Sequence, residues 1–235
     1  MKSEFLFNIF DCNKPASDIV HVSCVPLLID FENGLERLDE LRKSGMVLLS
    51  FPFVSRGKAI EKFSENFSEI AMHVDGFTLQ NFGDFGILND LFSSNITPRK
   101  KYFLAGDYSL NVTNSETAKF WENKLDSVAL LPELTQKSQL ELIADFPKNL
   151  KAEVICTDGV VAMRSEHCFA VRNESFRCGN CGKYGLSAGP LEGENHKKYQ
   201  IICNPLDCNC ILTAENPAPL DKGAFAALGN VIVRY

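Results

Sequence analysis

Short apolar runs alternate with longer amphipathic stretches along most of this chain. Runs of apolar and β-branched residues predict buried strands, whereas apolar residues that recur every three or four positions predict helices. The clearest helical stretch carries Leu35, Leu38 and Leu41 among charged residues before Gly45, which suits a helix end. Strands are expected at residues 5–10, 19–23, 47–51, 76–80, 102–105, 127–131, 153–157 and 231–234. Helices are expected at residues 33–44, 57–72, 84–92, 115–125 and 135–146, the fourth capped by Asn114 or Ser115.

This alternation predicts an α/β fold with a parallel sheet. Eight strands in 235 residues fit a (β/α)8 TIM-barrel-like fold. An open doubly wound sheet is the alternative, although no Gly-x-Gly-x-x-Gly follows the first strand. We expect a single domain over residues 1–235, in which an irregular Cys-rich excursion at about 164–212 replaces the helix after strand seven. No closing eighth helix is expected after the last strand.

The composition is that of a globular protein, with 45% hydrophobic and 23% charged residues. Lys and Arg total 24 and Asp and Glu total 30, a net charge of −6 that disfavours DNA binding and broad contact with phosphates. Local contact with RNA stays open because Arg99, Lys100 and Lys101 are consecutive. No apolar run has the length of a membrane span and the start of the chain lacks a signal-peptide pattern, so we expect a cytoplasmic protein without a membrane partner.

Nine cysteines are the most informative feature, and six of them lie between residues 168 and 210. In a reducing compartment such clusters bind metals or do redox chemistry. The spacing Cys168-x9-Cys178-x2-Cys181 supplies three thiolates, and a [4Fe–4S] cluster takes four. Cys24 is one candidate for the fourth, because it follows the second strand and would lie at the same barrel face as the excursion. The other candidates are Cys203, Cys208 and Cys210.

Zinc is the alternative metal. A structural zinc site would pair Cys178-x2-Cys181 with two cysteines of the 203–210 segment, but it would leave Cys168 without a role. The roles of Cys203 and Cys210 stay open on either interpretation.

Catalytic candidates are polar residues at the ends of predicted strands, where barrel enzymes carry their chemistry. Glu133 and Asn111 are such residues. A third candidate, His167, adjoins Cys168, where it either hydrogen-bonds a cluster sulfur or faces a substrate. His21 alternates within the second strand and either faces the barrel interior or is a core histidine with its hydrogen bonds satisfied. Residues 185–189 match Gly-x-Ser-x-Gly, but no strand precedes them, so they predict no peptidase nucleophile.

Several segments resemble the collagenase-like U-32 peptidase family, most closely its UbiV-type iron–sulfur proteins of anaerobic ubiquinone biosynthesis. Residues 74–83 resemble its Asp-x-hydrophobic…Asn-x-Gly segment, and residues 110–115 its Leu-Asn-x-x-Asn stretch. Residues 131–134 resemble its Pro-Glu-Leu element, and residues 153–168 its Glu-Val…Cys segment. Together these matches span nearly the whole chain.

The resemblance implies a barrel with one [4Fe–4S] cluster held by Cys168, Cys178 and Cys181. It offers two fourth ligands, namely Cys24 after strand two and Cys208 in the stretch Asn204–Cys208. It further implies oxygen-independent hydroxylation or a related redox modification of a ubiquinone-type precursor or an RNA base, and a heterodimer with a related U-32-family protein. Whether the chain is itself an enzyme is left open, the alternatives being a peptidase-family protein or a zinc-stabilised, non-catalytic partner subunit.

Overall fold

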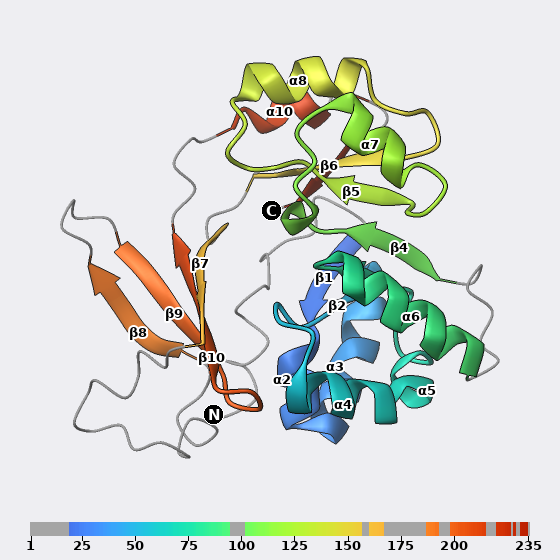
Figure 1. Ribbon diagram of the computed structural model, residues 1–235, viewed down its shortest axis with the longest axis vertical. Coiled ribbons are helices and arrows are strands. Elements are labelled where there is room, and N and C mark those ends of the chain that lie inside the picture. Colours follow the sequence, from blue (N-terminus) through green and yellow to red (C-terminus); the bar gives the residue numbers. More distant parts are fainter. Residues whose placement is uncertain are drawn as a thin grey trace.

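The computed structural model describes residues 19–94, 102–156, 160–166, 187–192, 198–214, 220–226, 228 and 231–234. Within these residues, seven parallel strands form one sheet in the order β1-β2-β3-β4-β5-β6-β11 (Figure 1). Its strands are β1 (Ile19–Ser23), β2 (Met46–Ser50), β3 (Gly76–Leu79), β4 (Phe103–Gly106), β5 (Ser127–Ala129), β6 (Lys151–Ile155) and β11 (Val231–Arg234). All seven correspond to predicted strands, whereas the strand predicted at residues 5–10 lies outside the described residues.

Each strand of this sheet lies beside the next one in the chain, so the described strands show no reversal of order. A doubly wound sheet has such a reversal, and that alternative is therefore not what the described residues form. The sheet is instead strongly curled. His21 Nε2 on β1 lies 3.3 Å from Glu153 Oε2 on β6, although five strand spacings of about 4.8 Å would separate these strands in a flat sheet. The molecule is thus a mixed α/β protein with a curled half-barrel.

Helices connect the strands along the outside of the curl (Figure 1). They are α2 (Cys24–Ile29), α3 (Phe31–Arg42), α4 (Gly57–Glu65), α5 (Phe67–Ile70), α6 (Phe82–Ser94), α7 (Ser115–Trp121) and α8 (Gln136–Ala144), with a 3-10 turn at Tyr108–Leu110. The predicted cap of α7 is confirmed, since Asn114 Oδ1 accepts a hydrogen bond from Thr117 N at 2.9 Å. The single helix predicted at 57–72 is divided at Asn66 into α4 and α5.

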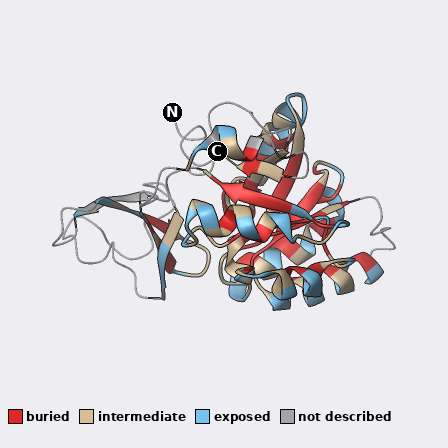
Figure 2. Ribbon diagram, turned by 90° about the horizontal axis from the view of Figure 1, so that it is seen from above, coloured by how far each residue is buried: buried red, intermediate tan, exposed pale blue. Residues whose placement is uncertain are grey.

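The apolar core lies between the sheet and these helices, where buried residues concentrate (Figure 2). Its centre is aromatic. The Phe77 ring of β3 stacks on Phe67 of α5 at a centroid distance of 5.5 Å and meets Phe63 of α4 edge-on at 6.2 Å. Phe92 and Tyr102 extend the cluster. Rings in tilted and offset pairs add to the stabilisation that burial alone supplies.

A second, antiparallel sheet occupies the segment that was expected to be an irregular excursion. Its strands, in the order β7-β10-β9-β8, are β7 (Val160–Ser165), β8 (Ser187–Glu192), β9 (Lys198–Asn204) and β10 (Asn209–Ala214). The expectation of irregular structure was therefore wrong for these residues. The physical reason is a hairpin pattern, in which apolar runs at Ile201–Cys203 and Cys210–Leu212 flank a Pro-Leu-Asp turn. A short helix, α10 (Lys222–Ala226), then precedes β11.

Contacts join the second sheet to the helices and loops around the first sheet. The turn between β9 and β10 carries Asp207, whose two carboxylate oxygens each accept a hydrogen bond from Ala59 N at 3.3 Å. On β7, Val161 N donates to the Tyr108 hydroxyl at 3.1 Å, and the Arg164 guanidinium lies 4.8 Å from the centre of the Phe53 ring.

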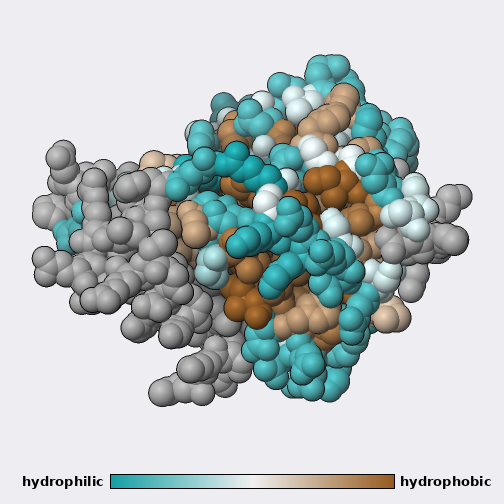
Figure 3. All heavy atoms as spheres, turned by 60° about the horizontal axis from the view of Figure 1, so that its bottom comes forward, coloured by the Kyte–Doolittle hydropathy of each residue, from teal (hydrophilic) through white to brown (hydrophobic). Residues whose placement is uncertain are grey.

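Hydrophilic side chains predominate over the helices on the face shown in Figure 3, and apolar side chains are exposed between them. None of the helices in the described part of the chain has the length and apolar character needed to cross a membrane.

Candidate functional site

One row of residues on the inner face of the curled sheet is small and polar, whereas the row that contains His21 also includes the buried Leu48. Parallel pairing aligns the polar row across five strands, and residues in such a row point to the same side of the sheet. The polar row consists of Ser23, Ser50, Thr78, Ala105 and Ser127. Barrels usually fill this space with branched apolar side chains, so the polar lining indicates a role other than packing.

Two titratable residues from opposite ends of the sheet meet on this face. His21 of β1 contacts Thr78 Oγ1 through Nδ1 at 2.8 Å and Glu153 Oε2 through Nε2 at 3.3 Å. The other Glu153 oxygen accepts a hydrogen bond from the Ser127 hydroxyl. Glu153 is fully buried and the His21 side chain is 8% exposed. With the neutral ring protonated on Nε2, Nδ1 accepts from the Thr78 hydroxyl, and Nε2–H lies beside the Glu153 carboxylate without the alignment of a hydrogen bond.

An arginine from the last strand completes the network. Arg234 Nη1 lies 2.7 Å from Asp107 Oδ1 at the end of β4 and 3.5 Å from Glu153 Oε2. Asp107 is buried, and the Arg234 side chain is 16% exposed. We refer to His21, Asp107, Glu153 and Arg234 as the inner charged network.

Burial and charge set the protonation states of this network. Burial alone raises the pKa of Glu153, but the His21 ring, the Arg234 guanidinium and the Ser127 hydroxyl outweigh it and lower that pKa to about 2. Burial, assisted by the positive charge of Arg234, lowers the pKa of His21. Near neutral pH, Glu153 is therefore ionised and His21 is neutral.

Such a network is costly to bury. Replacement of a buried ion pair by apolar residues of similar volume is often neutral or stabilising, because desolvation offsets the attraction between the charges. The inner charged network is consequently a better candidate for binding or proton transfer than for stability. A neutral His21 beside an ionised carboxylate is able to accept a proton from a bound group, and Arg234 is able to orient an anionic or carbonyl oxygen.

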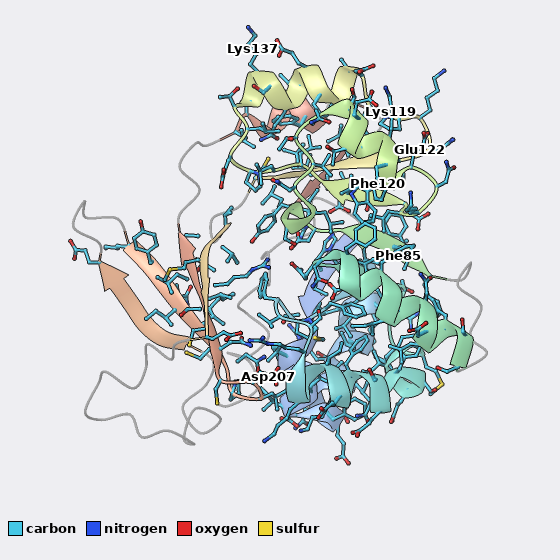
Figure 4. The ribbon with its side chains drawn as sticks, viewed as in Figure 1. Phe85, Lys119, Phe120, Glu122, Lys137 and Asp207 are labelled. Atoms are coloured by element: carbon cyan, nitrogen blue, oxygen red, sulfur yellow. The ribbon has the colours of Figure 1, made fainter. Side chains whose placement is uncertain are left out.

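A second cluster lies where the chain leaves β1. Cys24 begins α2 directly after that strand and is fully buried. Burial raises the pKa of its thiol, and the negative charges of Asp84 and Asp207 raise it further. Asp84 is itself buried, and its pKa is raised by burial although Gln80 N and Asn81 N donate to it at 2.7 and 3.0 Å. The β9–β10 turn docks on α4 through Asp207 (Figure 4), and α4 packs against α2, the helix that begins with Cys24.

Cys208 follows Asp207 in this turn. It is exposed and its backbone is in the left-handed region, with φ of 54°. The structure thus brings the two alternative fourth ligands, Cys24 and Cys208, to the same corner of the molecule. Cys168, Cys178, Cys181 and His167 lie outside the described residues. Within the described part of the chain, no three His, Cys, Asp or Glu side chains are arranged to hold a metal ion.

The other predicted site residues lie at the surface. Glu133 is exposed in the segment between β5 and α8. Asn111 is exposed as well, and it follows the 3-10 turn with a left-handed backbone, φ of 60°. Asparagine tolerates this conformation better than most residues, so Asn111 has a clear conformational role.

Residues of the motifs that resemble the U-32 family have structural roles here. Asp75 pairs with Arg42, at 2.8 Å between Oδ1 and Nη2, and accepts a hydrogen bond from Val47 N. Asn81 and Asp84 exchange side-chain to backbone hydrogen bonds at the start of α6, in the reciprocal arrangement of a capping box.

Three members of the inner charged network were not predicted as site residues. Glu153 was noted only within a motif, and Asp107 and Arg234 were not singled out. One signal was available, because a charged residue at an inner position of an otherwise apolar strand is unusual in a parallel sheet. Glu153 and Arg234 both stand among apolar neighbours in this way.

Comparison of the chain with protein-family models and with curated proteins gives no match. The resemblance to the U-32 family therefore stays a prediction that rests on the motifs alone.

Proposed function

We propose that this chain is a U-32-type barrel protein that binds one [4Fe–4S] cluster and supports an oxygen-independent hydroxylation or a related redox modification. The proposed substrate is a ubiquinone-type aromatic precursor or an RNA base, and the proposed setting is the cytoplasm, with a related protein as partner. The observation that carries the proposal is that the Asp207–Cys208 turn docks on α4, which packs against the helix that Cys24 begins directly after β1. Closure of the half-barrel into a (β/α)8 barrel belongs to the same proposal.

The cluster would be held by Cys168, Cys178 and Cys181, with Cys24 or Cys208 as the fourth ligand. When bound, a [4Fe–4S] cluster supplies one-electron transfer to or from a neighbouring molecule. Cys24 fits a ligand role by position. Because burial and two carboxylates keep its thiol protonated, loading has to release that proton, and we expect metal affinity to rise with pH.

The inner charged network would act on the substrate through the chain's own residues. Arg234 is placed to bind an oxygen of the substrate, and His21 to accept a proton at Nδ1 by way of the Thr78 hydroxyl that contacts it. Glu153 holds the His21 tautomer, and Ser127 and Thr78 fix the two side chains in turn. Carboxyl ends of parallel strands are where barrel enzymes bind their substrates, and this edge is also where Cys24 lies.

The test is purification without oxygen, followed by the visible spectrum and by iron, sulfide and zinc analysis. Broad visible absorption with about four irons and about four sulfides per chain is expected. Cys168→Ser and Cys181→Ser are expected to abolish the colour. Cys24→Ser and Cys208→Ser are compared because only one of them removes the fourth ligand, and that variant is expected to contain less iron. The matched control Cys156→Ser is expected to leave the iron content unchanged.

Because Cys24 lies in the apolar core, Cys24→Ala is compared with Cys24→Ser to separate lost ligation from disturbed packing. Colourless protein without iron would overturn the proposal. One zinc per chain without iron would favour the zinc-stabilised, non-catalytic subunit instead. Hydrolysis of peptides that persists after removal of all metal would favour a peptidase.

A further inference from the structure

Two buried cysteines of the β9–β10 hairpin lie opposite each other, and neither is among the ligands that the resemblance implies for the cluster. Cys203 on β9 and Cys210 on β10 are direct partners in the antiparallel register. Their exposed fractions are 5% and 1%, and their Sγ atoms lie 2.7 Å apart. The two thiols therefore already point at each other from neighbouring strands.

The geometry of the hairpin makes a bond between these sulfurs easy to form. Directly opposed residues on antiparallel strands have Cβ atoms about 4.5–5.5 Å apart, close to the span of a disulfide. The register is set by pairs on both sides, from Asn209–Asn204 to Ala214–Tyr199. Neither strand has to slide, so a bond between the two sulfurs fits the fold as it stands.

We propose that Cys203 and Cys210 are a redox-active dithiol that a low-molecular-weight disulfide of the glutathione type oxidises to an intrachain disulfide. One thiolate attacks the oxidant, breaks its S–S bond, forms a mixed disulfide and releases one small thiol. The second thiolate then displaces the other small thiol and forms the Cys203–Cys210 bond. Two cysteine protons are lost in all, two electrons pass to the oxidant, and its two halves leave as thiols.

The bond would close the turn that docks the second sheet. Residues 204–209 connect the two cysteines, and within them Asp207 accepts from Ala59 N at the start of α4. A disulfide at the base of the turn restricts the conformations in which Asp207 leaves α4. The redox state of the pair is thereby coupled to the corner of the molecule that holds Cys24 and Cys208. The proposal does not depend on the cluster.

The experiment is differential thiol labelling of the full-length protein in glutathione buffers of increasing disulfide content. Each sample is quenched with acid, unfolded and treated with N-ethylmaleimide, then reduced and treated with the deuterated reagent. Trypsin releases one peptide, Tyr199–Lys222, which contains Cys203, Cys208 and Cys210. Iron is measured in the same samples, so loss of metal is recorded separately from disulfide formation.

In oxidised samples, Cys203 and Cys210 are expected to carry the deuterated reagent together, because both were in a disulfide. Cys208 is expected to carry the unlabelled N-ethylmaleimide, because its thiol stayed reduced. Hydrogen exchange at the Ala59 amide is expected to slow in the same samples. In Cys203→Ala, Cys210 is expected to carry N-ethylmaleimide, or glutathione when a portion of the sample is analysed without the reduction step, whereas the control Cys156→Ala behaves as the parent.

N-ethylmaleimide on both Cys203 and Cys210 at every buffer ratio would show that neither thiol is oxidised and would overturn the proposal. The same result would overturn it if the two thiols had been bound to a metal until the protein was unfolded. Pairing of either residue with Cys208 would overturn it as well. The parent protein alone gives these outcomes, so the test does not depend on whether a variant folds.

Discussion

The two faces of the curled sheet differ in the side chains they carry and in the interactions those side chains make, although both faces belong to the same strands. On β3, Phe77 points outward into a cluster of buried rings, and the next residue, Thr78, points inward to His21. The outer face is apolar and packed by helices. The inner face holds two carboxylates, an arginine and a histidine that are stabilised largely by one another.

This difference indicates which face holds the fold together. Burial of apolar surface stabilises in proportion to the area removed from water, whereas buried charges contribute little net stability. We therefore assign most of the stability to the outer face and the chemistry to the inner one. Four experiments test that division, from the largest expected effect to the smallest.

Truncation of the aromatic core gives the largest effect. Phe77→Ala is expected to lower the free energy of unfolding by about 3–5 kcal/mol, because it removes a fully buried ring and leaves a cavity. Urea denaturation followed by circular dichroism measures it. Phe120→Ala is the control, since Phe120 of α7 is 46% exposed (labelled in Figure 4). Equal losses for the two variants would contradict the assignment of stability to the outer face.

Removal of one partner from the inner charged network gives an effect of about 3 kcal/mol. Arg234→Met leaves Asp107 and Glu153 buried without their counter-ion, and such an uncompensated charge strongly destabilises. The joint variant Arg234→Met, Glu153→Gln and Asp107→Asn removes the charges together and is expected to recover much of the loss in the same denaturation experiment. The contradicting outcome is a loss of unfolding free energy in the joint variant that equals the sum of the losses in the three single variants. In that case the network would stabilise the fold.

Acid titration tests the same network without truncation. The pKa of Glu153 is about 2 when folded against 4.5 for an ordinary glutamate, so the unfolded chain binds the proton first and stability falls as pH falls. The lowered pKa of His21 acts in the same direction, because protonation below its ordinary value of 6.5 favours the unfolded chain. Glu153 alone is expected to contribute a loss of about 2 kcal/mol between pH 7 and about pH 3.

Thermal or urea unfolding at a series of pH values measures this slope. Glu153→Gln is the matched variant, and its slope is expected to be shallower over the same range. A slope identical to that of the parent protein would show that Glu153 is not held ionised in the folded state.

The docking contact between the two sheets gives the smallest effect. Asp207→Ala removes the acceptor for Ala59 N at the start of α4 and is expected to cost about 1 kcal/mol, the usual size of a lost helix cap. Faster hydrogen exchange at Ala59 is the readout. Asn114→Ala, which removes the cap of α7, is the comparison of equal type. Unchanged exchange at Ala59 in Asp207→Ala would show that the turn is not held by this contact.

Local patterns were sufficient to predict much of the fold. The strand at Ile19–Ser23 and the last strand at Val231–Arg234 have the predicted bounds, and Asn114 caps the predicted helix. These features depend on residues within a few positions of one another. The irregular structure expected within the excursion was wrong, because apolar runs on either side of the turn at residues 205–208 pair as the antiparallel strands β9 and β10.

The candidate site was predicted only in part. Cys24 and Cys208 were identified from spacing and resemblance, and their common location depends on the contact between Asp207 and α4. Glu153 and Arg234 were not predicted as site residues because their roles depend on contacts with residues that are far apart in the sequence.

The sequence by itself determined the type and order of the elements of the parallel sheet, since apolar periodicity, caps and turn residues act locally. The tertiary structure alone decided how far the sheet curls, that His21 of β1 meets Glu153 of β6, and that Cys203 faces Cys210. The physical reason is that curl and register follow from the packing of all strands and helices together. No local pattern specifies which inward-facing side chains then meet.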